Sequence, residues 1–246
     1  MGDIYGYEIR RATSKDNDNI LDLMRKNFFR DEPLNIAVGL LENTDNCPEL
    51  EQFCLETLQD ELSLVAATPS GEIVGACLNG MHEDGHLEEM EAEANSCPNP
   101  KFRKILQLLA FLERRANVFS KFPGIKKLLE IRIVAVANDW RGKGIATALL
   151  ERTRQLAPGL GFTLIKVDCT SHFSARAMAK LNAECIFSMK YEDYCSPDSG
   201  EPVFRPDPPH TGVETYVQIA SPNNRGINGI IMNAQQKKKE ADILDR

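Results

Sequence analysis

An apolar stretch that ends in a glycine-rich turn constrains this 246-residue chain more than any other feature. Residues 131–136 read IRIVAV, a β-branched run that is typical of a buried strand. Residues 141–146, RGKGIA, follow shortly and lead into residues 147–152, which predict a helix. N–H groups at a helix start lack partners within the helix and lie at the positive end of its dipole. Because glycine lets a phosphate approach them closely, the turn predicts a site for a phosphorylated cofactor.

Two common nucleotide-binding motifs do not fit this turn. A Walker A loop needs Ser or Thr after its lysine, whereas Lys143 is followed by Gly144. A dinucleotide fingerprint needs GxGxxG, which is absent. The turn matches (R/Q)xxGx(G/A), with Arg141, Gly144 and Ala146 at the defined positions. This pattern resembles the acetyl-CoA pyrophosphate loop of the GNAT superfamily of N-acetyltransferases, and a glycine-rich turn without a ligand is the alternative.

The composition favours one globular domain, which we expect over residues 1–222, followed by a polar tail over residues 223–246. No 18-residue apolar run and no secretory leader are found, and the seven cysteines include no CxxC pair. These features predict a cytoplasmic chain with reduced thiols, no metal site and no membrane partner. The formal charge of −7 disfavours nucleic acid and suits a cationic small molecule. We expect a monomer.

Hydrophobic periodicity predicts an α/β fold with helices on both faces of a mixed, mostly antiparallel sheet. Ser14 is expected to cap the first helix, and the acidic residues 82–101 are expected to form a solvated loop. The order of elements follows that of the GNAT fold, so the resemblance covers residues 5–220. The expected strands are 5–12, 62–68, 72–79, 131–136, 163–168, 186–191 and 213–219, and the expected helices are 16–29, 47–60, 104–119, 124–129, 143–157 and 174–183.

The resemblance implies how acetyl-CoA would be held. The backbone of the turn would bind the pyrophosphate, and one edge of the preceding strand would pair with the pantetheine amides as an added strand does. Ser174 would also reach the cofactor, with helix capping as the alternative, and Lys143 could instead be only a solvated charge. The implied cofactor residues are Val134, Ala135, Val136, Arg141, Gly142, Lys143, Gly144, Ile145, Ala146, Thr147 and Ser174.

An amine must lose a proton before it attacks a thioester, so a general base is expected. Residues 28–34, FFRDEPL, resemble the catalytic corner of the insect arylalkylamine N-acetyltransferases, where the matching glutamate acts through ordered water. The resemblance makes Glu32 the base, although an acidic pair after a helix is otherwise more often a solvated turn. The amine would contact Phe28, Phe29, Glu32, Pro33 and Leu34.

Polar residues elsewhere match the same family. Ser171 and Ser174 follow the strand expected over residues 163–168, and the resemblance implies that they line the site, with helix capping as the alternative. His210 closes a proline-rich loop and could relay a proton or bind the amine, or be an ordinary surface histidine. A catalytic triad is rejected, because His172 has no carboxylate to orient it and no GxSxG is present. Where vertebrate relatives carry a catalytic tyrosine, this chain has Met178.

The resemblance therefore implies an N-acetyltransferase that moves the acetyl group of acetyl-CoA to a small primary amine, by direct attack in a ternary complex. The preferred substrates are arylalkylamines such as dopamine, octopamine, tyramine or serotonin. Agmatine or a polyamine is the alternative within the class. A regulatory protein that binds acyl-CoA without turnover is the alternative outside it.

Overall fold

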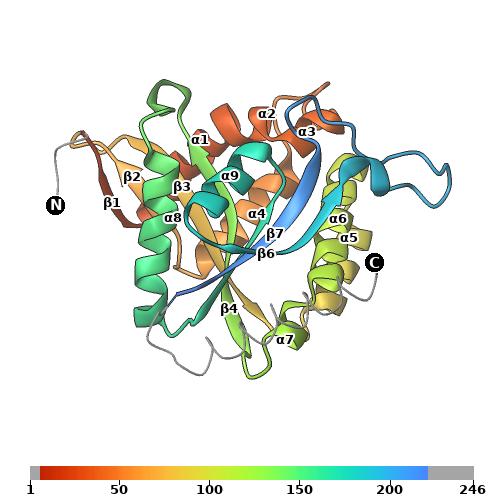
Figure 1. The fold of residues 1–246 in the computed structure, drawn as a ribbon. Helices are drawn as coiled ribbons and strands as arrows, with labels where there is room; N and C mark the ends of the chain where they lie inside the picture. The colour runs from red at the N-terminus through yellow and green to blue at the C-terminus, as the bar shows by residue number, and fades with distance from the viewer. Residues whose placement is uncertain (1–5, 221–246) are drawn as a thin grey trace.

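The computed structural model describes residues 6–220, and the predicted tail beyond residue 222 lies outside this range. Its centre is a seven-stranded sheet in the order β1-β2-β3-β4-β5-β7-β6, in which only β4 and β5 run parallel (Figure 1). The predicted α/β GNAT-type fold is confirmed. The strands are β1 (Glu8–Arg11), β2 (Leu64–Ala67), β3 (Ile73–Glu83), β4 (Lys127–Val136), β5 (Leu164–Cys169), β6 (Glu184–Lys190) and β7 (Gly212–Ile219).

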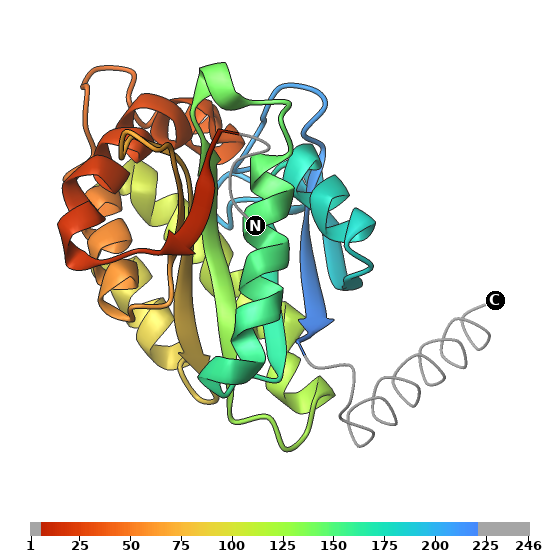
Figure 2. The same cartoon turned by 90° about the vertical axis from the view of Figure 1, so that its left-hand side faces the viewer.

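Helices cover both faces of the sheet, as Figure 2 shows. One face packs on α1, α4 and α6, and the other packs on α8 and α9, so each face has its own hydrophobic core. No helix among residues 6–220 is long and apolar enough to cross a membrane. The helices are α1 (Asn17–Leu23), α2 (Phe29–Asp31), α3 (Pro33–Ala37), α4 (Pro48–Gln59), α5 (Leu87–Ser96), α6 (Pro100–Ala116), α7 (Val118–Lys121), α8 (Ile145–Leu156) and α9 (His172–Lys180).

The parallel strands β4 and β5 form a fork. They pair at only three rungs, the last of which joins Ile131 to Val167. Beyond that rung β5 pairs with β7, while β4 keeps only β3 as a neighbour as far as Val136. The edge of β4 that faces β5 therefore has no partner strand over residues 132–136, as the sequence-based account of the cofactor site requires.

A β-bulge in β4 coincides with the opening of this fork. The register against β3 passes from Leu78↔Ile133 to Asn79↔Ile131, which leaves Arg132 without a partner in the ladder. The Arg132 guanidinium lies over Gly80, where even a Cβ atom would come within 2.6 Å of it. Because a bulge bends and twists its strand, it accounts for the departure of β4 from β5.

Several predictions of local structure are wrong. Residues 82–101 are not a solvated loop, since they contain the end of β3 and all of α5. Residues 124–129 are not helical, because β4 begins at Lys127. The helix expected over residues 16–29 is interrupted by a π-helical turn at Met24–Phe28, and its start is capped by a Thr13–Asp16 capping box rather than by Ser14.

The contact between α8 and the sheet predicts a sensitive glycine. A Cβ atom on Gly75 would lie 2.8 Å from Cγ2 of Ile145, the first residue of α8. Gly75→Ala is expected to lower the free energy of unfolding by about 1–3 kcal/mol through overpacking. The matched control is Gly159→Ala, where a Cβ atom meets nothing within 4 Å. Urea denaturation of both variants checks this, and equal stability of the two would contradict it.

Candidate active site

The turn between β4 and α8 has the geometry of an anion site. Gly142 and Gly144 adopt φ of +74° and +79°, a region that glycine occupies without strain. A Cβ atom at either position would meet nothing within 4 Å, so their backbone faces open space. The first backbone bond of α8 runs from Ala148 N–H to Gly144 O, which leaves the N–H groups of residues 145–147 at the open end of the helix.

Together the turn and the fork fit acetyl-CoA. The glycine turn offers N–H groups and a helix dipole to a diphosphate. The unpaired edge of β4 offers backbone N–H and C=O groups to an extended chain that carries amides, over the same Val134–Ala135–Val136 segment that the sequence indicated. An unpaired strand edge followed by the positive end of a helix dipole suits a diphosphate joined to a pantetheine arm.

Two side chains of the turn have partners within the protein. Arg141 donates from Nη2 to Oδ2 of Asp31 at 2.6 Å and from Nε to the carbonyl of Val136 at 3.2 Å. Lys143 is exposed, with Nζ 4.4 Å from the centroid of the Trp140 ring. The Arg141–Asp31 pair therefore ties the glycine turn to the residue that precedes Glu32.

Glu32 occupies a corner that Pro33 imposes. A residue before proline avoids helical geometry, and Glu32 is extended with φ −69° and ψ 126°. It separates α2 from α3 and caps α3, since its Oε2 accepts the Asn35 N–H at 2.8 Å. The side chain is 8% exposed, so the alternative of a solvated turn is wrong.

The surroundings of Glu32 suit a general base. Burial raises its pKa to about 7, against the opposing effects of the Asn35 N–H and the nearby Thr170 side chain. Its Oε1 is buried and accepts no hydrogen bond from any described residue. Thr170 directly follows β5. Arg141, which donates to Asp31, follows β4, so residues beyond the ends of both strands of the fork lie at this corner.

The raised pKa predicts how stability depends on pH. Protonated Glu32 is favoured in the folded state, so its stabilising effect is complete below pH 4.5 and disappears as the pH rises through 7. Relative to wild type, Glu32→Gln should gain about 3 kcal/mol of unfolding free energy between pH 4 and pH 8. Urea denaturation at both pH values checks this, and parallel pH profiles for the two proteins would contradict it.

The residues predicted to contact the amine surround Glu32. Pro33 and Leu34 follow it directly and are buried, and Phe29 is 1% exposed. Phe28 is half-buried, and its ring packs edge-on against Phe29 at a centroid distance of 6.3 Å. Phe29 and Leu34 belong to the hydrophobic core on the α1, α4 and α6 side of the sheet, and Phe28 packs against it.

Ser171 and Ser174 form the cap of α9. The Ser171 Oγ accepts the Ser174 N–H at 3.0 Å, and the Ser174 Oγ accepts the Ser171 N–H at 3.3 Å. Ser171 is thus the N-cap and Ser174 the third helical residue, which corrects the prediction that Ser174 begins the helix. Both hydroxyls therefore cap α9, and both lie shortly after the end of β5.

His210 lies against the same helix start. Its Nδ1 accepts the His172 N–H at 3.2 Å, and burial together with His172 lowers its pKa. This contact requires an unprotonated Nδ1, so the neutral ring carries its proton on Nε2 and is a donor there. Met178, at the position of the vertebrate tyrosine, is 1% exposed and has no proton to give.

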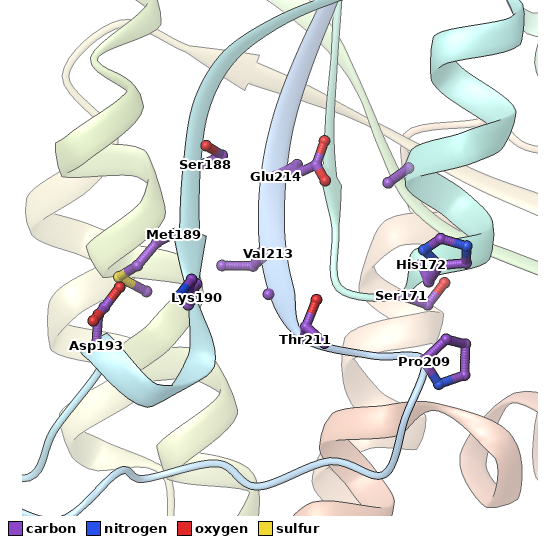
Figure 3. A pocket seen from close by; sticks show the side chains of 12 residues that line it. Ser171, His172, Ser188, Met189, Lys190, Asp193, Pro209, Thr211, Val213 and Glu214 are labelled. Carbon is purple, nitrogen blue, oxygen red and sulfur yellow. The ribbon is translucent and has the colours of Figure 1, made fainter.

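A pocket of about 330 Å³ adjoins this region (Figure 3). Ser171, His172 and Pro209 line one side of it, and β6 and β7 line the other. Asp193 and Glu214 supply carboxylates, and no Phe, Tyr or Trp is among the lining residues. Glu32 is not a lining residue, so the pocket lies beside the corner rather than over it.

Sequence reasoning missed two features near the fork. Tyr191 is 3% exposed, donates its hydroxyl to the Thr170 carbonyl at 2.7 Å, and has a pKa raised by burial and by the charge of Glu32. Lys166 is fully buried on β5 and contacts three carboxylates, of Glu113, Glu130 and Asp168. A lysine and an aspartate two positions apart in an apolar strand were the only signal available.

Comparison with known proteins agrees with this geometry. Residues 24–182 match the model of the acetyltransferase (GNAT) family. The structure resembles arylalkylamine N-acetyltransferase 2 from Aedes aegypti, with 34% identity and a TM-score of 0.83 over 87% of this chain and 99% of the other. It also resembles the mosquito arylalkylamine N-acetyltransferase-like 5b (28%, 0.79) and the polyamine N-acetyltransferase of Drosophila melanogaster (27%, 0.78), with the same coverage. The chain therefore belongs to the GNAT family of acetyltransferases, enzymes that take their acetyl group from acetyl-CoA.

Proposed function

We propose that this protein is an arylalkylamine N-acetyltransferase that acetylates a small biogenic amine in a ternary complex with acetyl-CoA. The observation that carries the proposal is the buried Glu32 carboxylate, whose pKa of about 7 suits proton transfer near neutral pH. The 34% identity to an arylalkylamine N-acetyltransferase, over 87% of this chain and 99% of the other, supports the choice of amine.

The proposed reaction needs no covalent enzyme intermediate. Glu32, directly or through water, takes one proton from the ammonium group of the substrate. The amine nitrogen then attacks the thioester carbon. As the carbon–sulfur bond breaks and the CoA thiolate leaves, the nitrogen loses its second proton to water, which gives the neutral amide. Cys169 does not fit the role of a nucleophile, because burial raises the pKa of its thiol far from neutrality.

The departing thiolate needs a proton donor. Ser171 and Ser174 lie where β5 leaves the fork, and His210 carries its proton on Nε2, so these side chains are the proposed donors, with water as the alternative. The backbone of residues 142–147 and the β4 edge hold the cofactor during this step. Phe28, Phe29, Pro33 and Leu34 form the apolar surroundings of the amine.

A panel of amines tests the substrate. Release of the CoA thiol from acetyl-CoA is measured with dopamine, octopamine, tyramine and serotonin, and with agmatine, putrescine and spermidine. The proposal expects the highest kcat/KM with an arylalkylamine. A higher kcat/KM with every aliphatic amine would reject the arylalkylamine assignment, and no thiol release with any amine would reject the enzyme.

One observation favours agmatine or a polyamine as the second candidate. The pocket in Figure 3 is lined by two carboxylates, of Asp193 and Glu214, by one ammonium group, of Lys190, and by no large aromatic side chain. The excess of carboxylates suits a second cationic group. The Drosophila relative that forms N-acetylagmatine matches the same 87% of this chain. Under this candidate Glu214→Gln should raise the KM of agmatine and leave that of tyramine unchanged.

A further inference from the structure

A buried ion pair joins β4 to β5 in the paired part of the fork. Of the three rungs that join the strands, the middle one pairs Glu130 with Lys166. Residues that face each other across a rung project to the same side of the sheet, and here Nζ of Lys166 lies 2.9 Å from Oε1 of Glu130. The last rung before the strands separate comes directly after this pair.

The same cluster also holds the bulge. Arg132, the bulged residue, donates from Nε to Oε2 of Glu130 at 3.2 Å and from Nη1 to Oγ1 of Thr57 at 3.1 Å. Glu130 is therefore shared between Lys166, which fastens β4 to β5, and Arg132, where β4 turns away. One carboxylate connects the closed part of the fork to its open part.

Neighbouring elements complete the charge balance. Glu113 of α6 lies 2.8 Å from Lys166 Nζ and 3.2 Å from His82 Nε2, and Asp168 lies 2.9 Å from Lys166 Nζ and accepts from Thr215. Burial alone lowers the pKa of Lys166, but the three carboxylates raise it well above its usual value. All three ammonium protons thus face a carboxylate.

Stability alone does not require such a cluster. Burying an ion pair removes its hydration, and this cost offsets much of the attraction between the two charges. Well-packed apolar side chains therefore often stabilise a core equally well or better. What an ion pair adds is a fixed geometry. The ion pair fixes the rung next to the point where the strands separate. It therefore sets where the free edge of β4 begins, and with it the end of the site for an extended ligand on residues 134–136.

We propose that Glu130 and Lys166 are positioning residues for acetyl-CoA. The pair holds β4 and β5 at the separation that lets the β4 edge and the glycine turn bind the same cofactor molecule. This inference rests on the proposed cofactor site. Neither side chain touches the cofactor in this account. They act through the place at which the strands part.

Two isosteric variants separate positioning from plain stabilisation. Glu130→Gln and Glu113→Gln each remove one carboxylate from Lys166, but only Glu130 belongs to the fork. Glu130→Gln is expected to weaken acetyl-CoA binding about tenfold in calorimetry at 20 °C, because small displacements of a binding site are costly. Glu113→Gln should stay within about twofold of wild type, whatever its melting temperature.

Equal loss of affinity in the two variants, or wild-type affinity in Glu130→Gln, would overturn the inference. If Glu130→Gln does not fold, as circular dichroism would reveal, Glu130→Asp is used instead, since it keeps the charge but withdraws the carboxylate from Lys166 by one methylene. An affinity for acetyl-CoA weakened about threefold is then expected, and wild-type affinity overturns the inference. Absence of acetyl-CoA binding by the wild-type protein would instead reject the cofactor site itself.

Discussion

Glu32→Gln should lower kcat by about 10²–10³-fold and leave the affinity for acetyl-CoA unchanged. Gln has nearly the same shape as Glu, and its amide oxygen can still accept the Asn35 N–H, so α3 keeps its cap. What is lost is the group that accepts a proton. In wild type the rate should rise with pH through about 7, where Glu32 ionises, and this rise should be absent from the variant.

Steady-state rates between pH 5.5 and 9, with calorimetry of acetyl-CoA, check this prediction. Glu32→Asp is the matched variant, since it keeps a carboxylate but withdraws it by one methylene, and it should retain more activity than Glu32→Gln. Wild-type kcat in Glu32→Gln would remove Glu32 from the role of base.

Gly144→Asp should weaken acetyl-CoA binding by at least about 100-fold, because like charges in contact cost several kcal/mol. Gly144 is the N-cap of α8, and an aspartate there would place its carboxylate where the diphosphate is expected. A non-glycine residue at φ +79° also adds about 1–3 kcal/mol of backbone strain. The backbone strain lowers the free energy of unfolding, whereas the added charge weakens the binding of acetyl-CoA.

Gly124→Asp separates these two effects. Gly124 has φ +97° and open space around its Cβ position, but it lies in the turn before β4. Both variants should lose stability to a similar extent in urea denaturation, and only Gly144→Asp should lose acetyl-CoA binding in calorimetry. Normal binding by Gly144→Asp would exclude the turn as the pyrophosphate site.

The parts of the fold that follow from local sequence were predictable. A β-branched run followed by glycines sufficed to place the second half of β4, its turn and α8, although not the start of β4 at Lys127. Pro33 restricts the residue before it, so the extended corner at Glu32 could be anticipated. The α5 helix was missed because its acidic composition obscured a short apolar stripe of Leu87, Met90 and Ala94, the last of which is 1% exposed.

Long-range contacts could not be predicted from one sequence. The Arg141–Asp31 ion pair joins residues 110 positions apart, and Lys166 finds Glu130 across 36 positions. Such pairs depend on which strands become neighbours and where a bulge falls. The burial of Glu32, and therefore its raised pKa, likewise depends on packing that only the folded chain creates.

The central claim is that backbone amides of residues 142–147 and the free edge of β4 hold acetyl-CoA. The most direct measurement is a titration of ¹⁵N-labelled protein with acetyl-CoA, followed by amide chemical shifts. The largest shifts are expected at residues 134–136 and 142–147, with saturation at one equivalent. Shifts confined to other parts of the chain, or none at millimolar acetyl-CoA, would contradict the account.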